Sequence, residues 1–387
     1  MPRTASALRS RPPRALALAL LLASAAAAEP PAPSRLPAQR IDVAYPTRGW
    51  PRGDARGADH IAIEVAVGKL FAKKSPAGVP DTRALLVVQG GKLVVERYAP
   101  GFDATSRFRS WSAGKSLANA WIGLLVRDGR VALDEPLDAR PWRARADDPR
   151  REITVRHALG MTTGLANADG DGGAADSFIA QLLFGGAAGD TALAAADVAL
   201  DAPPGTRWAY STATTQLLAG LVVDRAGEDW REFTARELNR PLGMGSLVVE
   251  ADRAGTPIAG AFVWASAQDW ARLGLLYLRD GLWEGRRILP PGWVDFTRTP
   301  AAAEDNGTYG AHFWINAEPR PGQHPVFAGR AFDSFEMSGN AGQIVAIVPG
   351  RDLVVVRLGE MHAISWAELR GGLADLIETF PIGGGAR

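Results

Sequence analysis

The pair of residues with the clearest chemical potential is Ser112 and Lys115, three positions apart where a loop is expected to turn into a helix. A serine hydroxyl is a weak nucleophile and needs an adjacent base, and residues three apart on a helix share a face. Lys115 is the one lysine after position 93, among many arginines. Arginine keeps its proton at any workable pH, whereas burial lowers the pKa of a lysine. The spacing predicts a serine nucleophile beside a lysine base; the alternative is a helix-capping serine beside a solvated lysine.

The elements that must position this pair are predicted from hydrophobic periodicity. Strand patterns lie near both ends of the chain and helical patterns lie between them, which indicates an α+β fold whose antiparallel sheet is built from both termini, with an inserted helical region. The expected elements are a helix over 59–74, strands over 83–88 and 92–98, helices over 112–129, 216–226 and 266–281, strands over 310–315, 343–348 and 353–358, and a helix over 366–380.

The composition is that of a globular protein. The 387 residues are 47% hydrophobic and 22% charged, and there is no cysteine, which excludes disulfides and thiolate chemistry. Histidines are scattered at His60, His157, His312, His324 and His362 without a metal-binding spacing, so no metal or cofactor is expected. There is no Gly-x-Ser-x-Gly motif, which argues against an α/β-hydrolase.

The first 28 residues are typical of a secretory signal peptide. They contain four arginines and no acidic residue, then an apolar run and a stretch of alanines suited to cleavage. Without them the formal charge is −3 rather than +1, which argues against a nucleic-acid partner. We expect a periplasmic or secreted protein with no stable membrane anchor after cleavage. A lead-in over 29–57 precedes one domain over 58–370, with its sheet part at about 58–110 and 255–387 and its helical part at about 111–254; residues 371–387 form the end of the last helix and a tail.

Several motifs follow one another in an order that resembles the serine β-lactamase and penicillin-binding-protein-like superfamily. Within it, the chain is most similar to the class C-type branch, which holds esterases and 6-aminohexanoate-dimer hydrolases. The resemblance covers about residues 83–370 and is carried by Ser112–Lys115, Asp128–Pro136, Ile153–Leu165, Pro204–Thr212, Pro241–Met244 and Ser338–Pro349.

The resemblance implies that Ser112 is acylated and that Lys115 and Tyr210 handle its proton. A phenol beside a cationic lysine is expected to favour its ionised form, so that it can accept a proton and return it to the leaving group. Thr212 occupies a position that is asparagine in many lactamases, which favours simpler amides and esters over lactams.

A third motif of the family, a lysine or histidine two residues before a glycine, matches best at Asn340-Ala341-Gly342. It has no cation at its first position, which weakens the case for a carboxylate-bearing substrate. The resemblance implies an oxyanion hole at the backbone N–H groups of Ser112 and Gln343. The alternative for this segment is an ordinary strand edge that carries glycines.

These observations predict a serine hydrolase that cleaves a small-molecule amide or ester through an acyl-serine intermediate. One alternative is a β-lactamase or D-Ala-D-Ala carboxypeptidase, and another is a non-catalytic homologue that binds peptides or cell-wall fragments. The predicted substrate-binding residues are Trp111, Thr212, Trp314, Asn340 and Gly342.

Overall fold

The structure is a computed structural model in which residues 35–37, 40, 43–166, 169, 177–316, 326–327, 330 and 333–383 are described. All of these residues belong to one compact unit. The predicted signal peptide lies outside the described residues, as does most of the loop that follows position 166. No helix among the described residues is both long and apolar enough to cross a bilayer.

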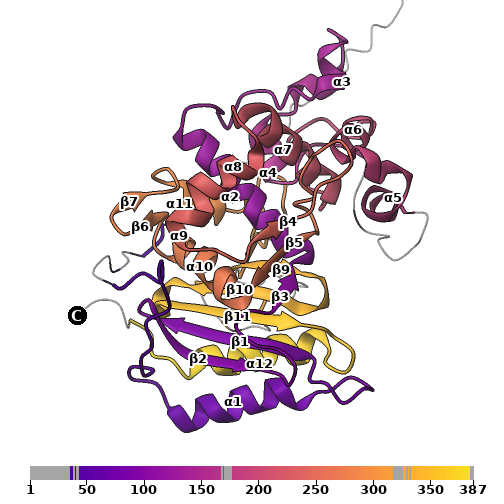
Figure 1. Ribbon diagram of the computed structural model, residues 1–387. Coiled ribbons are helices and arrows are strands. Elements are labelled where there is room, and N and C mark those ends of the chain that lie inside the picture. The colour runs from indigo at the N-terminus through magenta and orange to yellow at the C-terminus, as the bar shows by residue number, and fades with distance from the viewer. Residues whose placement is uncertain are drawn as a thin grey trace, which may run out of the picture. The chain divides into compact units, whose positions relative to one another are not determined.

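A six-stranded antiparallel sheet built from both ends of the chain forms the base of this unit, as predicted (Figure 1). The predicted hairpin is present as the first two strands, and β1 also pairs with β11 near the C-terminus, with Leu85 opposite Arg357. The strand order is β2 (Lys92–Tyr98), β1 (Thr82–Gln89), β11 (Leu353–Gly359), β10 (Gln343–Val348), β9 (Phe335–Gly339) and β8 (Trp314–Ile315).

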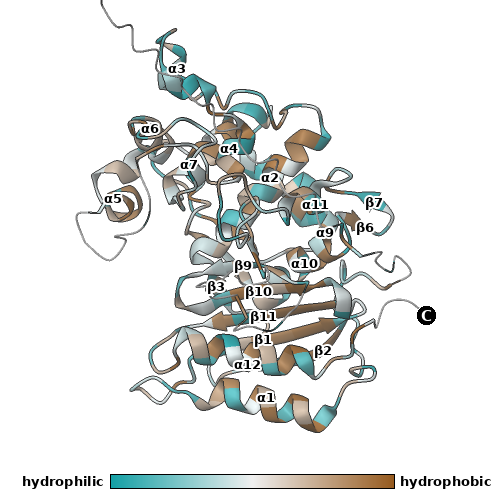
Figure 2. Ribbon diagram, turned by 180° about the vertical axis from the view of Figure 1, so that it is seen from behind, coloured by the Kyte–Doolittle hydropathy of each residue, from teal (hydrophilic) through white to brown (hydrophobic). Residues whose placement is uncertain are grey.

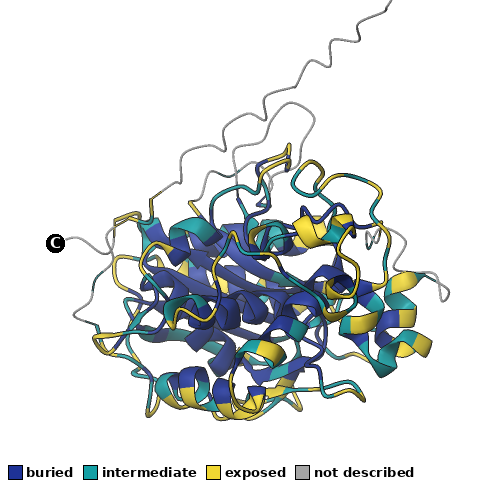
Figure 3. Ribbon diagram, turned by 90° about the horizontal axis from the view of Figure 1, so that it is seen from above, coloured by how far each residue is buried: buried dark blue, intermediate teal, exposed yellow. Residues whose placement is uncertain are grey.

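Both faces of the sheet are buried, because apolar side chains point to both sides of each inner strand. Along β11, Leu353 and Val355 pack into the core on one face, whereas Val354 and Val356 pack into the core on the other. The inner strands are accordingly almost continuously hydrophobic (Figure 2) and lie in the buried centre of the unit (Figure 3).

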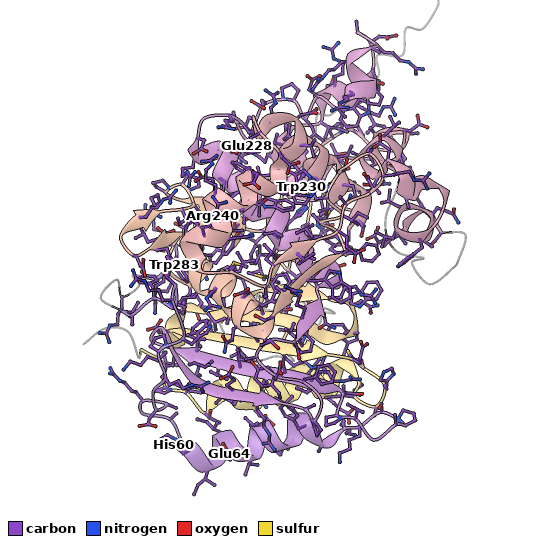
Figure 4. All side chains as sticks on the ribbon, viewed as in Figure 1. His60, Glu64, Glu228, Trp230, Arg240 and Trp283 are labelled. Carbon is purple, nitrogen blue, oxygen red and sulfur yellow. The ribbon has the colours of Figure 1, made fainter. Side chains whose placement is uncertain are left out.

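Two terminal helices cover one face of the sheet and one internal helix covers the other. On the first face, α1 (His60–Ala72) lies against α12 (Trp366–Glu378), and Figure 4 shows His60 and Glu64 on α1, at the far side from the helical part. On the second face, α10 (Ala267–Leu278) packs on β10 and β11, and the side chain of Ser266 caps it as predicted.

The helical part lies beyond α10 and contains the predicted helix after Ser112. That helix is α2, and it is tied to α8 by an edge-to-face contact between Trp121 and Trp230, whose ring centroids are 5.8 Å apart (Figures 1 and 4). The helices here are α2 (Lys115–Arg127), α3 (Arg140–Arg143), α4 (Val155–Leu159), α5 (Phe178–Phe184), α6 (Thr191–Ala196), α7 (Thr212–Arg225), α8 (Trp230–Thr234), α9 (Arg240–Leu242) and α11 (Trp293–Thr297).

Short strands and turns connect these layers. The small sheet of β3 (Arg107–Arg109), β5 (Val263–Ser266) and β4 (Val248–Val249) leads into the turn that carries Ser112, and β6 (Leu282–Trp283) pairs with β7 (Arg286–Arg287). The single-turn helices are η1 (Trp111–Gly114), η2 (Pro149–Glu152), η4 (Gly186–Gly189), η6 (Asn340–Gly342) and η7 (Pro349–Arg351), and a π-helical turn η5 (Ala235–Asn239) lies between α8 and α9.

Three expectations differ from the structure. The strand predicted over 310–315 is reduced to β8, because His312 has a φ of 59°, which turns the chain before Trp314. Ser112 lies in the 3₁₀ turn η1 rather than in the following helix. The domain boundary predicted at 370 falls within α12, a helix whose apolar residues pack on the sheet.

Candidate active site

Lys115 is buried and bonded to Ser112, so the alternative of a solvated lysine does not hold. The residue as a whole is only 1% exposed. Its Nζ donates to Ser112 Oγ at 3.0 Å, to Thr212 Oγ1 at 2.9 Å and to the carbonyl oxygen of Gly260 at 3.2 Å. These three acceptors match the three N–H bonds of an ammonium group. The amine is therefore held in one place against the predicted nucleophile.

The turn that presents Ser112 is fixed by its neighbours on the small sheet. The backbone N–H of Ser110 donates to the carbonyl of Val263 at 2.7 Å, continuing the pairing of β3 with β5. Trp111 then adopts a φ of 46°, a left-handed conformation that costs free energy in a non-glycine residue. The chain changes direction at this residue and enters the 3₁₀ turn that contains Ser112.

Burial makes Lys115 a feasible base. Removal from water disfavours the charged form and lowers the pKa of Lys115 to about 8, although the negative charge of Asp169 acts in the opposite direction. A general base is most effective when its pKa lies near the working pH. The amine can therefore exist in both protonation states under ordinary conditions.

Tyr210 lies beside the same pair, just before α7. Lys115 Nζ is 4.9 Å from the centre of its ring, and the ring is enclosed by Tyr309 and Trp314 at centroid distances of 5.7 and 5.6 Å. Burial raises the pKa of Tyr210 above the ordinary value for a phenol, a side-chain hydrogen bond with Ser112 lowers it, and Asp169 raises it again. The shift in the pKa of Tyr210 thus runs opposite to the expectation of a readily ionised phenol, and burial is its largest cause.

Thr212 connects Lys115 to an aspartate that sequence reasoning missed. Besides accepting from Lys115, the Thr212 hydroxyl donates to Asp169 Oδ2 at 2.5 Å, and the Thr212 backbone N–H donates to both carboxylate oxygens at 2.9 Å. Asp169 comes from a loop rich in glycine, alanine and aspartate, in which no spacing distinguishes it from its neighbours.

The pocket in front of Ser112 has a volume of about 330 Å³. It contains two of the predicted substrate-binding residues, Trp314 and Asn340. A separate cavity of about 230 Å³ between α3, α6 and α7 contains none of the predicted site residues. The pocket at the nucleophile is lined by Ser112, Tyr210, Trp314, Val326, Ser338, Gly339, Asn340, Trp366 and Arg370.

The strand that meets the nucleophile is β9, and its contact residue is Gly339. A Cβ atom at this position would lie 2.2 Å from the carbonyl oxygen of Ser110 and 3.1 Å from the amide nitrogen of Ser112, so only glycine allows this approach. The residues two and one before this glycine are Met337 and Ser338. The glycine that meets the Ser112 turn therefore lies three residues before Gly342, the last residue of the third motif as predicted at Asn340-Ala341-Gly342.

The remaining predicted residues do not reach the pocket. Gln343 is buried, and its side-chain amide donates to the carbonyl of Gly359 at 2.6 Å, on the adjoining strand β11. Gly342 faces the Arg357 guanidinium. Trp111 stacks under Arg109 at 3.7 Å and packs on a small cluster near α5 that includes Phe262. The structure thus brings Ser112, Tyr210, Trp314 and Asn340 to the pocket, with Lys115 and Thr212 buried beside Ser112. Trp111, Gly342 and Gln343 lie outside it, and Thr212, predicted to bind substrate, does not line it either.

The pocket also contains a cation that the third motif did not predict. Arg370 reaches it from α12, pairs with Glu336 and donates to Ser338 Oγ at 3.2 Å. The Arg370 side chain is 14% exposed and that of Glu336 is 1% exposed. Trp366, one helical turn earlier, lines the same pocket. The spacing of Trp366 and Arg370 on one face of α12 is the local signal that could have indicated that this face meets the pocket.

His312 is a packed histidine near the base of the site. Its Nδ1–H donates to the carbonyl of Leu159 at 2.8 Å, so Nε2 accepts from the Thr215 hydroxyl at 3.0 Å. Burial lowers the pKa of His312 to about 3, and its ring is neutral at physiological pH. Within the described part of the chain, no three His, Asp or Glu side chains gather so that they could hold a metal ion.

Comparison with known proteins finds relatives that share this fold. A 6-aminohexanoate-dimer hydrolase from Paenarthrobacter ureafaciens is 23% identical over an alignment of 332 residues that covers 76% of each chain. A Bacillus anthracis structure provisionally named as a 6-aminohexanoate-dimer hydrolase superposes with a TM-score of 0.66 at 20% identity, covering 86% of each chain. A penicillin-binding protein homologue from Caulobacter crescentus gives a TM-score of 0.60 at 17% identity over 84% of this chain and 100% of the other.

These structural matches establish a β-lactamase and transpeptidase-like fold. The family match reaches further, because residues 81–359 fit the family described as Beta-lactamase, from the first strand of the central sheet to the end of β11. That span includes the Ser112 turn, the buried Lys115, Tyr210 and the strand that meets them. The chain belongs to the β-lactamase family, whose fold is that of a family of hydrolases.

Proposed function

We propose that this protein is a serine hydrolase that cleaves small, uncharged amides or carboxylic esters through an acyl-Ser112 intermediate. The observation that carries the proposal is the 3.0 Å contact between the buried Lys115 Nζ and Ser112 Oγ. The pKa of Lys115, lowered to about 8 by burial, leaves part of the amine neutral and able to accept the serine proton.

In the acylation step, Ser112 Oγ attacks the substrate carbonyl carbon while its proton passes to Lys115 Nζ. The carbonyl oxygen becomes an oxyanion, which we place between the backbone N–H groups of Ser112 and Asn340. Asn340 follows Gly339, the residue that contacts the Ser112 turn, and lines the pocket with Ser112, whereas Gln343 is buried away from it. Two such donors stabilise developing negative charge without reorganisation.

Tyr210 completes the proton transfers as a neutral phenol. When the tetrahedral intermediate collapses, the C–O or C–N bond of the substrate breaks and the leaving group takes the phenol proton, which Lys115 replaces. Water then attacks the acyl carbon and gives one proton to the same pair. The bond between the acyl carbon and Ser112 Oγ breaks, Oγ takes that proton back, and the carboxylic acid is released. The raised pKa of Tyr210 supports a proton donor rather than a resident phenolate.

The substrate class follows from the charge and lining of the pocket. Arg370 is neutralised by Glu336, and Trp314 and Trp366 supply apolar walls, which favours an uncharged acyl group over a carboxylate. The name of the Paenarthrobacter relative points to linear amides, and a structural neighbour described as a hydrolase with promiscuous acyltransferase activity points to acyl transfer more broadly.

The decisive experiment is intact-mass analysis after treatment with a fluorophosphonate probe. We expect one adduct on the wild-type protein and none on Ser112→Ala, while Ser106→Ala, in an exposed turn, reacts like the wild type. The absence of any wild-type adduct would favour a binding protein. A panel of p-nitrophenyl esters, nitrocefin and linear amide dimers then separates an esterase or amidase from a β-lactamase.

We also propose that the protein is exported, on the basis of its first 28 residues. N-terminal sequencing of protein purified from the culture supernatant or periplasm is expected to begin close to Glu29. Recovery of the uncleaved chain in the cytoplasm would contradict this.

A further inference from the structure

We propose that Asp169 is a positioning residue which, through Thr212, holds Lys115 in place and sets the pH range in which Lys115 can act as a base. The inference rests on the proposed function of Ser112 and Lys115 and adds a residue that touches neither the nucleophile nor the substrate pocket.

The Thr212 hydroxyl has one proton, and the structure shows where it goes. The hydroxyl lies 2.5 Å from Asp169 Oδ2, and a carboxylate can only accept, so the hydroxyl donates to it. Its lone pairs are then left to accept from Lys115 Nζ at 2.9 Å. The carboxylate therefore fixes the direction of the Thr212–Lys115 hydrogen bond, which favours the protonated amine.

Asp169 is itself built into the start of α7. Both of its oxygens accept from the Thr212 backbone N–H at 2.9 Å, and its own backbone N–H donates to the carbonyl of Tyr210 at 2.8 Å. A carboxylate at the N-terminus of a 14-residue helix is also stabilised by the helix dipole. Because both oxygens face Thr212, the group is placed to act on the catalytic residues.

The other groups that face Lys115 carry no compensating charge. Ser112, Thr212 and the Gly260 carbonyl are neutral. Tyr210 has a raised pKa, and His312, which lies within the electrostatic reach of Lys115, has a pKa of about 3, so both are uncharged at neutral pH. Among the described residues near the amine, Asp169 is the carboxylate that opposes the effect of burial on Lys115.

The test measures the rate of fluorophosphonate labelling of Ser112 against pH by intact mass, with the full-length mature protein. For the wild type, we expect the rate to rise with a midpoint near the Lys115 pKa of about 8. Replacing the negative charge in Asp169→Asn should move the midpoint down by about one pH unit, the lower end of the effect of a nearby opposite charge. Labelling at pH 6, relative to the plateau rate, should then be about tenfold faster.

Two Thr212 variants and one aspartate control complete the design. Thr212→Val breaks the link and should lower the midpoint as Asp169→Asn does, which keeps the test available if that variant fails to fold. Thr212→Ser retains the hydroxyl and should keep the wild-type midpoint. Asp201→Asn, an exposed partner of Arg207, should leave the profile unchanged.

The outcomes are distinct. A lower plateau with an unchanged midpoint in both Asp169→Asn and Thr212→Val would mean that Asp169 only supports the fold. That result would overturn this inference and leave the proposed function intact. Absence of labelling of the wild type at every pH would overturn the proposed function, and this inference with it.

Discussion

Two cations belong to the site, Arg370 in the pocket lining and Lys115 bonded to Ser112, and each is accompanied by a carboxylate, but the two pairs are built differently. Arg370 contacts Glu336 directly, whereas Lys115 is separated from Asp169 by the hydroxyl of Thr212. A direct buried pair keeps both of its charges, because removing either leaves the other uncompensated. The intervening hydroxyl weakens the attraction by distance, and the amine can still lose its proton.

We therefore expect Arg370 to be a structural cation and Lys115 to be a cation that takes part in proton transfer. Arg370 lines the pocket with Trp366 and donates to Ser338, so we expect this pair to influence which substrates bind. Lys115 is buried outside the pocket lining, where it is bonded to Ser112 and lies beside the ring of Tyr210. Substitutions around Lys115 should change the rate of the reaction, and those around Arg370 should change which substrates react.

The largest effect is expected for Lys115→Arg, which keeps a positive charge but cannot lose its proton. We expect kcat/KM for a p-nitrophenyl ester to fall by about 10²–10⁴-fold, the usual contribution of a general base. Lys69→Arg, on the exposed side of α1, is the matched control and should keep full activity. An Lys115→Arg protein that folds and turns over at the wild-type rate would show that Lys115 is not the base.

Gly339→Ala changes the residue of β9 that contacts the Ser112 turn. Its Cβ would collide with the Ser110 carbonyl oxygen and push β9 away from the Ser112 turn, so we expect a loss of about 10²–10³-fold in kcat, as for removal of an oxyanion donor. Gly371→Ala on α12, where an added Cβ meets no atom within 4 Å, is the control. Thermal melting of both variants distinguishes a local displacement of β9 from unfolding.

Tyr210→Phe removes one hydroxyl and leaves the ring between Tyr309 and Trp314. If the phenol protonates the leaving group, kcat/KM should fall by about 10²-fold for an anilide or alkyl ester and much less for a p-nitrophenyl ester, whose leaving group needs no proton. Tyr98→Phe, whose hydroxyl binds Glu96 on β2, is the control. Equal losses for both leaving groups would argue for a role of Tyr210 before bond cleavage.

The smallest effect is expected for Glu336→Gln, which removes the partner of Arg370. This change leaves Arg370 without a counter-charge, so the selectivity ratio for a p-nitrophenyl hemisuccinate over p-nitrophenyl butyrate should rise by about fivefold, the equivalent of about 1 kcal/mol for a partly exposed ion pair. The double variant with Arg370→Gln should abolish the gain. An unchanged ratio in Glu336→Gln would mean that Arg370 does not reach the acyl group.

Local patterns allowed the prediction of much of the fold and of the central pair of the site. The β1–β2 hairpin, the Ser266 cap and the Ser112–Lys115 spacing all involve residues close in sequence, whose side-chain period or hydrogen-bonding capacity determines their conformation. Asp169 and Arg370 could not be found in this way. Asp169 lies in a glycine-rich loop and Arg370 in the last helix. Only the tertiary fold brings Asp169 to Thr212 and Arg370 to the pocket.

The third motif shows the limit of pattern reading within a single segment. Gly339 and Gly342 are three residues apart, and neither has the lysine or histidine of the family pattern two positions before it. Both lack a Cβ for steric reasons, but Gly339 makes room for the Ser112 turn and Gly342 for the Arg357 guanidinium. The sequence shows a glycine at each position, but it does not indicate which neighbouring residue requires it.

The pairing of β1 with β11 has a consequence for biosynthesis. Leu85 is made much earlier than its partner Arg357, so the central sheet cannot close until β11 has left the ribosome. Chains interrupted before Leu353 would carry the serine and the lysine but lack an inner strand of the sheet. Chains that end before β11 are therefore expected to be inert toward a serine-reactive probe and open to proteolysis.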